Sequence, residues 1–212
     1  MTEENPGRRP IASRDVALVR SMARRLAARN ITPNQISQSS MVFAGLSGLS
    51  FCLSGLSATP LFLVLAGAFI QLRLLANLLD GLVAVEGGMG THDGDFWNEV
   101  PDRVSDSLIL AGAGMAIGTP SLGLLAAIGA LMTAYLRAMS SALASKEDYS
   151  GPMAKQHRMA TMTIAALIGA LEASYSGTSF ALFFALCAVA GGSFLTAFRR
   201  SKTLLSYLNR RG

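Results

Sequence analysis

Carboxylate and carboxamide side chains recur at helical spacing in the middle of the chain. They are Asn77, Asp80, Asn98, Asp102 and Asp106. Steps of three and four residues put side chains on one face of a helix, so these residues form two polar stripes. The stretch 73–106 that contains them holds 7 of the chain's 13 acidic residues, although long apolar runs lie on both sides of it. Ionisable residues inside a membrane-embedded chain are costly and mark functional sites.

Oxygen ligands without histidine or thiolate suit the hard cations Mg²⁺, Mn²⁺ and Ca²⁺ rather than zinc. Clustered carboxylates also need a cation among them if they are to stay ionised together. The same residues would equally suit a proton relay or an ion pathway through a membrane. Spacing alone therefore leaves the chemistry open.

The composition predicts an all-α, polytopic membrane protein. Of 212 residues, 51% are hydrophobic and only 15% are charged, against roughly a quarter in soluble domains. The mean hydropathy is +0.42. The net charge of +5 comes from basic residues at the ends of apolar segments. A cytoplasmic membrane face explains them better than nucleic acid, which is not expected as a partner.

Six apolar segments approach the roughly 20 residues that cross a bilayer. They are expected at about 38–56, 61–86, 95–117, 120–145, 158–175 and 178–198. Before them, residues 13–30 alternate apolar and basic side chains at helical spacing, which predicts an amphipathic helix at the membrane interface or, alternatively, a solvated basic helix. The expected organisation is a cytoplasmic N-terminal segment (1–30), a six-helix membrane domain (31–200) and a basic cytoplasmic tail (201–212).

The distribution of basic residues predicts the orientation. Seven of the 18 Lys and Arg residues precede the first span and five follow the last, whereas the loops near 57–60, 118–119 and 176–177 carry none. By the positive-inside rule, both termini and the loop 87–94 face the cytoplasm of a plasma or inner membrane. The two polar helices joined by this short, glycine-rich loop are expected to run antiparallel and adjacent, with their polar faces converging.

The spaced residues also resemble a family signature. The chain reads Asn77-Leu-Leu-Asp80-Gly81-Leu-Val-Ala84-Val85, then eight residues, then Gly94-x-x-x-Asn98-x-x-x-Asp102. This resembles the signature of the CDP-alcohol phosphatidyltransferases, Asp-x-x-Asp-Gly-x-x-Ala-Arg, eight residues, Gly-x-x-x-Asp-x-x-x-Asp. The segment Thr32-Pro33-Asn34 before the first span also looks like that family. The departures are Asn77 and Asn98 in place of aspartates and Val85 in place of arginine.

The resemblance implies roles for the individual residues. Asp80 would be a ligand of Mg²⁺ or Mn²⁺, and Asp102 would be both ligand and catalytic base. Asn77 and Asn98 would ligate through their amide oxygens, with Asp106 as a compensating ligand, and one or two cations remain possible. The substrate-binding candidates are Asn34, Arg73, Gly81, Ala84, Gly94, Arg137, Lys155 and Arg158. The alternative role is pairing with the carboxylates for Arg73, an internal salt bridge for Arg137, and a snorkelling or lipid-headgroup-binding cation for Lys155.

The implied reaction moves a phosphatidyl group from a CDP-linked lipid of the CDP-diacylglycerol type to an alcohol acceptor and releases CMP. The implied partners are this lipid, the acceptor, membrane lipids and a second copy of the chain in a homodimer. The acceptor stays open among glycerol 3-phosphate, an inositol phosphate, serine and other polyols, with a tilt toward a phosphorylated one. The alternative is a relative that has lost catalysis and acts as a membrane interaction protein.

Overall fold

Helices make up all of the regular structure in the computed structural model, which describes residues 17–57, 59–144 and 147–210. Proline opens three of the helices, where its fixed backbone angle suits the first turn. The helices are α1 (Ala17–Ala28), α2 (Pro33–Ser57), α3 (Pro60–Glu86), α4 (Gly94–Ala116), α5 (Pro120–Ala144), α6 (Lys155–Tyr175) and α7 (Phe180–Leu208). The predicted all-α class is confirmed.

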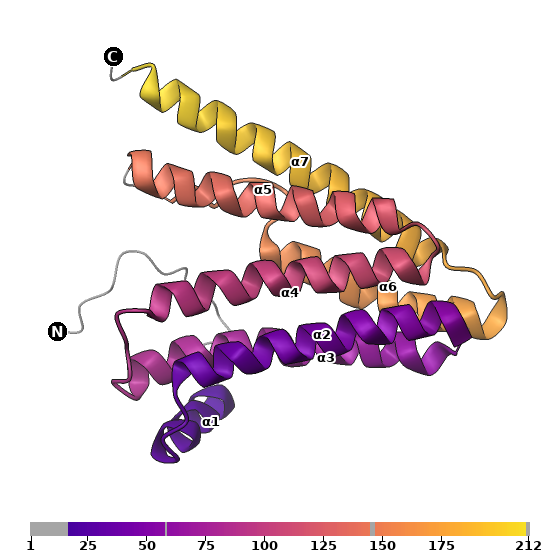
Figure 1. Cartoon of the computed structure of the whole chain (residues 1–212), viewed down its shortest axis with the longest axis horizontal. Coiled ribbons are helices and arrows are strands. Elements are labelled where there is room, and N and C mark those ends of the chain that lie inside the picture. The colour runs from indigo at the N-terminus through magenta and orange to yellow at the C-terminus, as the bar shows by residue number, and fades with distance from the viewer. Residues whose placement is uncertain (1–16, 58, 145–146, 211–212) are drawn as a thin grey trace.

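The six long helices form a ring in which each packs against two neighbours (Figure 1). The order around the ring is α2, α3, α6, α7, α5 and α4, and α4 closes it against α2. One expectation was wrong: α3 and α4 run antiparallel, but over the described helices they are not packed neighbours. The reason is that α2 packs against both of them, so their polar faces meet through long side chains rather than through close backbone contact.

Small residues set how closely α2 approaches α4. A Cβ atom added to Gly48 would lie 2.6 Å from the carbonyl oxygen of Leu108, and one added to Gly112 would lie 2.4 Å from the carbonyl oxygen of Gly48. Both distances are too short for a side chain, so the two backbones are in direct contact here. Contacts of this kind are typical of helices packed within membranes.

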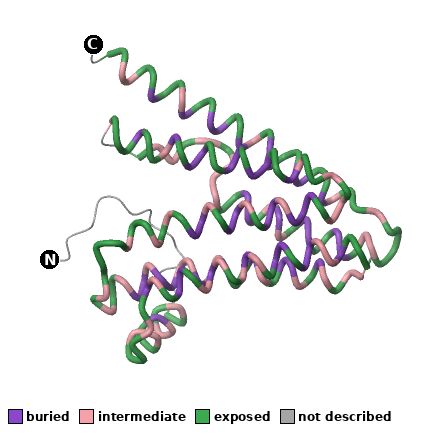
Figure 2. Tube along the Cα trace, in the orientation of Figure 1, coloured by how far each residue is buried: buried purple, intermediate pink, exposed green. Residues whose placement is uncertain are grey.

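Four helices, α2, α3, α5 and α7, are long and apolar enough to cross a membrane. Figure 2 shows their buried positions turned toward neighbouring helices and many exposed positions turned outward. The helices α4 and α6 are of similar length but carry several charged residues, among them Asp102 and Asp106 on α4 and Lys155 and Arg158 on α6. The expected total of six spans therefore stays a prediction for these two helices.

The predicted N-terminal helix is present as α1, and its apolar side packs against α3. Val19, Met22 and Leu26 lie on this side, while Arg24 and Arg25 are exposed. Residues 13–16 of the predicted helix lie outside the described part of the chain. Its place at a membrane interface stays a prediction. At the other end, α7 continues to Leu208, so most of the segment expected as a tail is helical.

We expect Gly48→Ala to destabilise the protein by about 1–3 kcal/mol, because its methyl group would press against the α4 backbone. Gly45→Ala is the matched control on the same helix, since nothing lies within 4 Å of the Cβ position there. That control should be neutral or stabilise by up to about 1 kcal/mol, because alanine is the better helix former. Chemical unfolding of the purified protein in detergent micelles measures both, and equal unfolding free energies would contradict the assigned contact.

Candidate functional site

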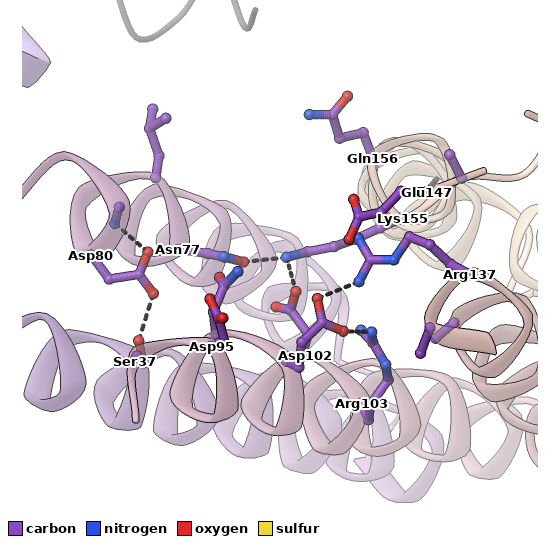
Figure 3. Close-up of a pocket in the computed structure, with 18 of the residues that line it drawn as sticks. Ser37, Asn77, Asp80, Asp95, Asp102, Arg103, Arg137, Glu147, Lys155 and Gln156 are labelled. Atoms are coloured by element: carbon purple, nitrogen blue, oxygen red, sulfur yellow. Dashed lines mark hydrogen bonds and ion pairs between the residues drawn. The ribbon is translucent and has the colours of Figure 1, made fainter. Parts of the chain in front are cut away.

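A cavity of about 1510 Å³ opens between the helices near the α3–α4 loop (Figure 3). Most of the residues singled out from the sequence line it. They are Asn77, Asp80, Gly81, Ala84, Gly94, Asn98, Asp102, Arg137, Lys155 and Arg158. The other three, Asn34, Arg73 and Asp106, lie elsewhere. The residues of the spaced motif, which helical periodicity predicts on two polar faces, therefore line one cavity.

Asp80 is held by neutral donors. It is only 4% exposed, and its Oδ2 accepts a hydrogen bond of 2.6 Å from the hydroxyl of Ser37 on α2. Its Oδ1 accepts a second bond of 2.6 Å from the backbone N–H of Gly81. Sequence reasoning missed Ser37, whose signal is its place one helical turn after Pro33, where α2 begins. The two bonds fix the orientation of the Asp80 carboxylate at the cavity wall.

Arg73 joins α3 to α4 from beneath the cavity. Its side chain is fully buried, and its Nη2 donates to Asp102 Oδ1 at 2.9 Å and to Asp106 Oδ1 at 3.1 Å. Of the two roles that the sequence left open, the structure shows pairing with the carboxylates. Two other nitrogens of this guanidinium, Nε and Nη1, have no hydrogen-bond partner within the described part of the chain.

Asp106 binds a second arginine. Its Oδ2 accepts a bond of 2.8 Å from Nη2 of Arg158 on α6. Nη1 of Arg158 donates to Thr133 Oγ1 at 3.2 Å and to the carbonyl oxygen of Met153 at 2.9 Å. Both carboxylate oxygens of Asp106 are thus occupied by arginines, and Asp106 supports the cavity floor from inside the bundle.

Lys155 closes the site from the first residue of α6. Its ammonium group donates to the amide oxygen of Asn77 on α3 and to Oδ2 of Asp102 on α4 (Figure 3). Asp102 is therefore bonded to a cation through each of its oxygens. Asp80, Asp102 and Asp106 lie near Arg73, Lys155 and Arg158, and the formal charges of these six groups sum to zero. Another buried cation, Arg200, donates to the carbonyl oxygens of Ser150 and Thr133.

This arrangement does not fit a divalent-cation centre. Within residues 17–57, 59–144 and 147–210, no three His, Cys, Asp or Glu side chains are grouped so that they would hold a metal ion. The oxygens of Asn77 and Asp102 point to Lys155 instead, and those of Asp80 accept from Ser37 and Gly81. Mg²⁺ or Mn²⁺ was an expectation from the resemblance, and no step proposed below depends on either.

A second ion cluster forms another part of the cavity wall. Glu99 accepts bonds from Arg103, one turn further along α4, and from Arg137 of α5. The guanidinium of Arg137 also lies 5.6 Å from the ring centre of Tyr149. The salt-bridge alternative for Arg137 is therefore what the structure shows. Glu99 is not among the residues expected from the sequence, although its spacing of four residues to Arg103 is a recognisable signal.

Asn34 fastens the start of α2 to the α3–α4 loop instead of lining the cavity. Its Nδ2 donates to Asp93 Oδ2 at 3.2 Å, and the indole N–H of Trp97 donates to the same oxygen at 3.0 Å. A hydrogen bond from Thr91 holds the pKa of Asp93 below its ordinary value. Asp93 therefore stays ionised as an acceptor for both residues at neutral pH.

Comparisons with known proteins support the fold. No model of a protein family matches the chain. An inner membrane protein of Escherichia coli K12, YnbA, is 28% identical over 134 residues, which are 63% of this chain and 65% of YnbA. The chain thus matches slightly less than two thirds of the length of this relative. With four apolar helices of sufficient length, the match supports an integral membrane protein.

Solved structures of the phosphatidylinositol phosphate synthase of Mycobacterium tuberculosis share this fold. The structure with CDP-DAG bound has a TM-score of 0.75 at 20% identity, and the alignment covers 88% of this chain and 93% of that one. The complex with manganese and citrate also has a TM-score of 0.75 at 20% identity, with 88% of each chain covered. The apo form has a TM-score of 0.73 at 20% identity, covering 87% of this chain and 95% of that one.

The ion pairs of Asp106 generate a stability prediction. Asp106→Asn should destabilise the fold by about 3–5 kcal/mol, because it leaves the buried arginines Arg73 and Arg158 short of one negative charge. Asp95→Asn, on the exposed first turn of the same helix, is the control and should change stability by less than about 0.5 kcal/mol. Chemical unfolding in micelles measures both, and similar values for the two variants would contradict the structural role of Asp106.

Proposed function

We propose that this protein is a membrane phosphatidyltransferase that moves a phosphatidyl group from a CDP-linked lipid to an alcohol acceptor. The observation that carries the proposal is that Asp80 and Asp102 of the spaced motif line one cavity together with Lys155. The fold supports it, because a phosphatidylinositol phosphate synthase of the same fold is known with CDP-DAG bound. The orientation with this cavity toward the cytoplasm, and a homodimer, belong to the same proposal.

The chemistry follows from the groups that face the cavity. The acceptor hydroxyl oxygen attacks the lipid-linked phosphorus of the CDP-lipid, and a new phosphorus–oxygen bond forms. The bond from this phosphorus to the oxygen that bridges the two phosphates breaks, and CMP leaves with that oxygen. The hydroxyl proton passes to the carboxylate of Asp102, which acts as general base.

The remaining residues of the cavity would bind and orient the substrates. Lys155 is a partly exposed cation that contacts two residues of the motif, and its ammonium would contact the diphosphate as negative charge develops there. Gly81 presents no side chain beside Asp80, which leaves room for the nucleotide. Ala84 and Gly94 are equally small and would line the same nucleotide site. Arg137, on the opposite wall, would bind an anionic acceptor by exchanging its bond to Glu99 for one to the acceptor.

A second function is favoured by one observation, the engagement of both Asp102 oxygens with cations. A carboxylate tied in this way would suit a non-catalytic membrane interaction protein. The two functions differ in whether a CDP-linked lipid is consumed, so one assay separates them.

We expect the purified protein, incubated with CDP-diacylglycerol and a panel of alcohols, to release CMP. The panel holds glycerol 3-phosphate, an inositol phosphate, serine and neutral polyols, and each reaction is run with Mn²⁺ and with EDTA. Asp102→Asn should lower turnover by about 100-fold or more, because it removes the base. Asp80→Asn should lower it strongly as well, because an amide offers one oxygen and so cannot accept both the Ser37 and the Gly81 hydrogen bonds that orient this part of the cavity wall.

Glu86→Gln is the matched control, because Glu86 is exposed and forms a surface ion pair with Arg20 away from the cavity. It should turn over like the unchanged chain. Full activity of both aspartate variants would show that the site assignment is wrong. No CMP release with any acceptor from folded protein would favour the interaction protein.

A further inference from the structure

The site places an ammonium group between two residues of the motif. Lys155, at the start of α6, donates to Asn77 of α3 and to Asp102 of α4, so one cation bridges the two polar stripes. We propose that Lys155 does the work of a divalent cation here, and that the chain binds the diphosphate of a CDP-linked nucleotide without a metal ion. This inference rests on the proposed function, because it concerns the same nucleotide.

The balance of formal charges supports the replacement of a divalent cation by Lys155. Two motif positions carry amides, Asn77 and Asn98, so two formal negative charges are absent relative to the aspartate signature. Two signature carboxylates, Asp80 and Asp102, remain. Arg73, Lys155 and Arg158 pair with Asp102 and with Asp106 one turn further on, whereas Asp80 is held by neutral donors. A divalent cation added beside the Lys155 ammonium would bring two unmatched positive charges into a poorly screened interior, where like charges repel strongly.

Among Arg73, Lys155 and Arg158, the cations that pair with Asp102 and Asp106, exposure identifies Lys155 as the one that can reach a ligand. The Lys155 side chain is 28% exposed, whereas that of Arg73 is 0% and that of Arg158 is 4% exposed. The two arginines are thus confined to the support of Asp102 and Asp106. An ammonium has three N–H donors, so Lys155 can turn one toward a phosphate oxygen and keep its bond to Asp102.

Asn77 fits this role better than an aspartate would. Its amide oxygen accepts a hydrogen bond from Lys155 and adds no charge. The ammonium therefore keeps part of its positive charge for a phosphate. An aspartate at this position would complete a second ion pair with Lys155 and oppose the approach of an anion.

Two measurements on the full chain in detergent micelles test the proposal, with Mn²⁺ and CDP as the probes. Electron paramagnetic resonance counts bound Mn²⁺, and calorimetry measures the CDP dissociation constant in EDTA and in Mn²⁺. We expect no saturable Mn²⁺ binding by the unchanged chain and the same CDP affinity in both buffers. Lys155→Met should weaken CDP binding by about tenfold or more, because a charge-assisted bond is lost. Lys202→Met, an exposed lysine of α7, should leave it unchanged.

A second pair of variants keeps the test valid if Lys155→Met folds poorly. Asn77→Asp retains Lys155 and should weaken CDP binding in EDTA. The triple variant Asn77→Asp/Asn98→Asp/Lys155→Met restores the carboxylates and removes the ammonium, so it should gain saturable Mn²⁺ binding.

Stoichiometric Mn²⁺ on the unchanged chain, or CDP binding that disappears in EDTA, would overturn the metal-free site while leaving the transferase function intact. Absence of CDP binding in both buffers would overturn the role of Lys155, and CMP release then decides the transferase function separately.

Discussion

The structure depends on one buried charge, the guanidinium of Arg73. A lone cation inside an apolar bundle costs several kcal/mol, so it persists only with carboxylates beside it. Arg73 reaches from α3 to Asp102 and Asp106, which lie one turn apart on α4. Because a single nitrogen serves both carboxylates, it restricts how far α4 can slide or rotate relative to α3. Two helices that do not pack directly are thereby held in one register.

The packing of the other helices around Arg73 positions the remaining residues of the site. α2 packs against α3 and α4, and Ser37 of α2 holds Asp80. From α6, Arg158 and Lys155 complete the charge balance of Asp106 and Asp102. Arg73 and Arg158 thus form ion pairs at the base of the interior and are nearly inaccessible, whereas the partly exposed Lys155 faces the cavity. Of these three cations, Lys155 is therefore the one that can exchange a protein partner for a ligand.

Local periodicity was enough to predict much of the site. Steps of three and four residues placed Asn77, Asp80, Asn98 and Asp102 on converging faces, and all four line one cavity. The adjacency of α3 and α4 was wrong, because a short loop fixes connection and direction but not which third helix packs between. The Ser37 bond to Asp80 and the Lys155 bridge join residues 43 and 53 or more positions apart. Such contacts depend on the packing of α2 and α6, which periodicity within one segment does not encode.

The free-energy cost of burying this network of ion pairs bears on the function of the chain. A protein that used this fold only as a scaffold would gain from apolar residues here, because replacing a buried ion network with well-packed hydrophobic side chains is neutral or stabilising. Instead, Asp102 and Lys155 face a cavity of about 1510 Å³, with Glu99 and Arg137 on another part of its wall. Cations at the wall of a large cavity are suited to an anionic ligand, and stability alone does not require them there. The cost of burying these charges therefore favours the binding of an anionic ligand over a purely structural role.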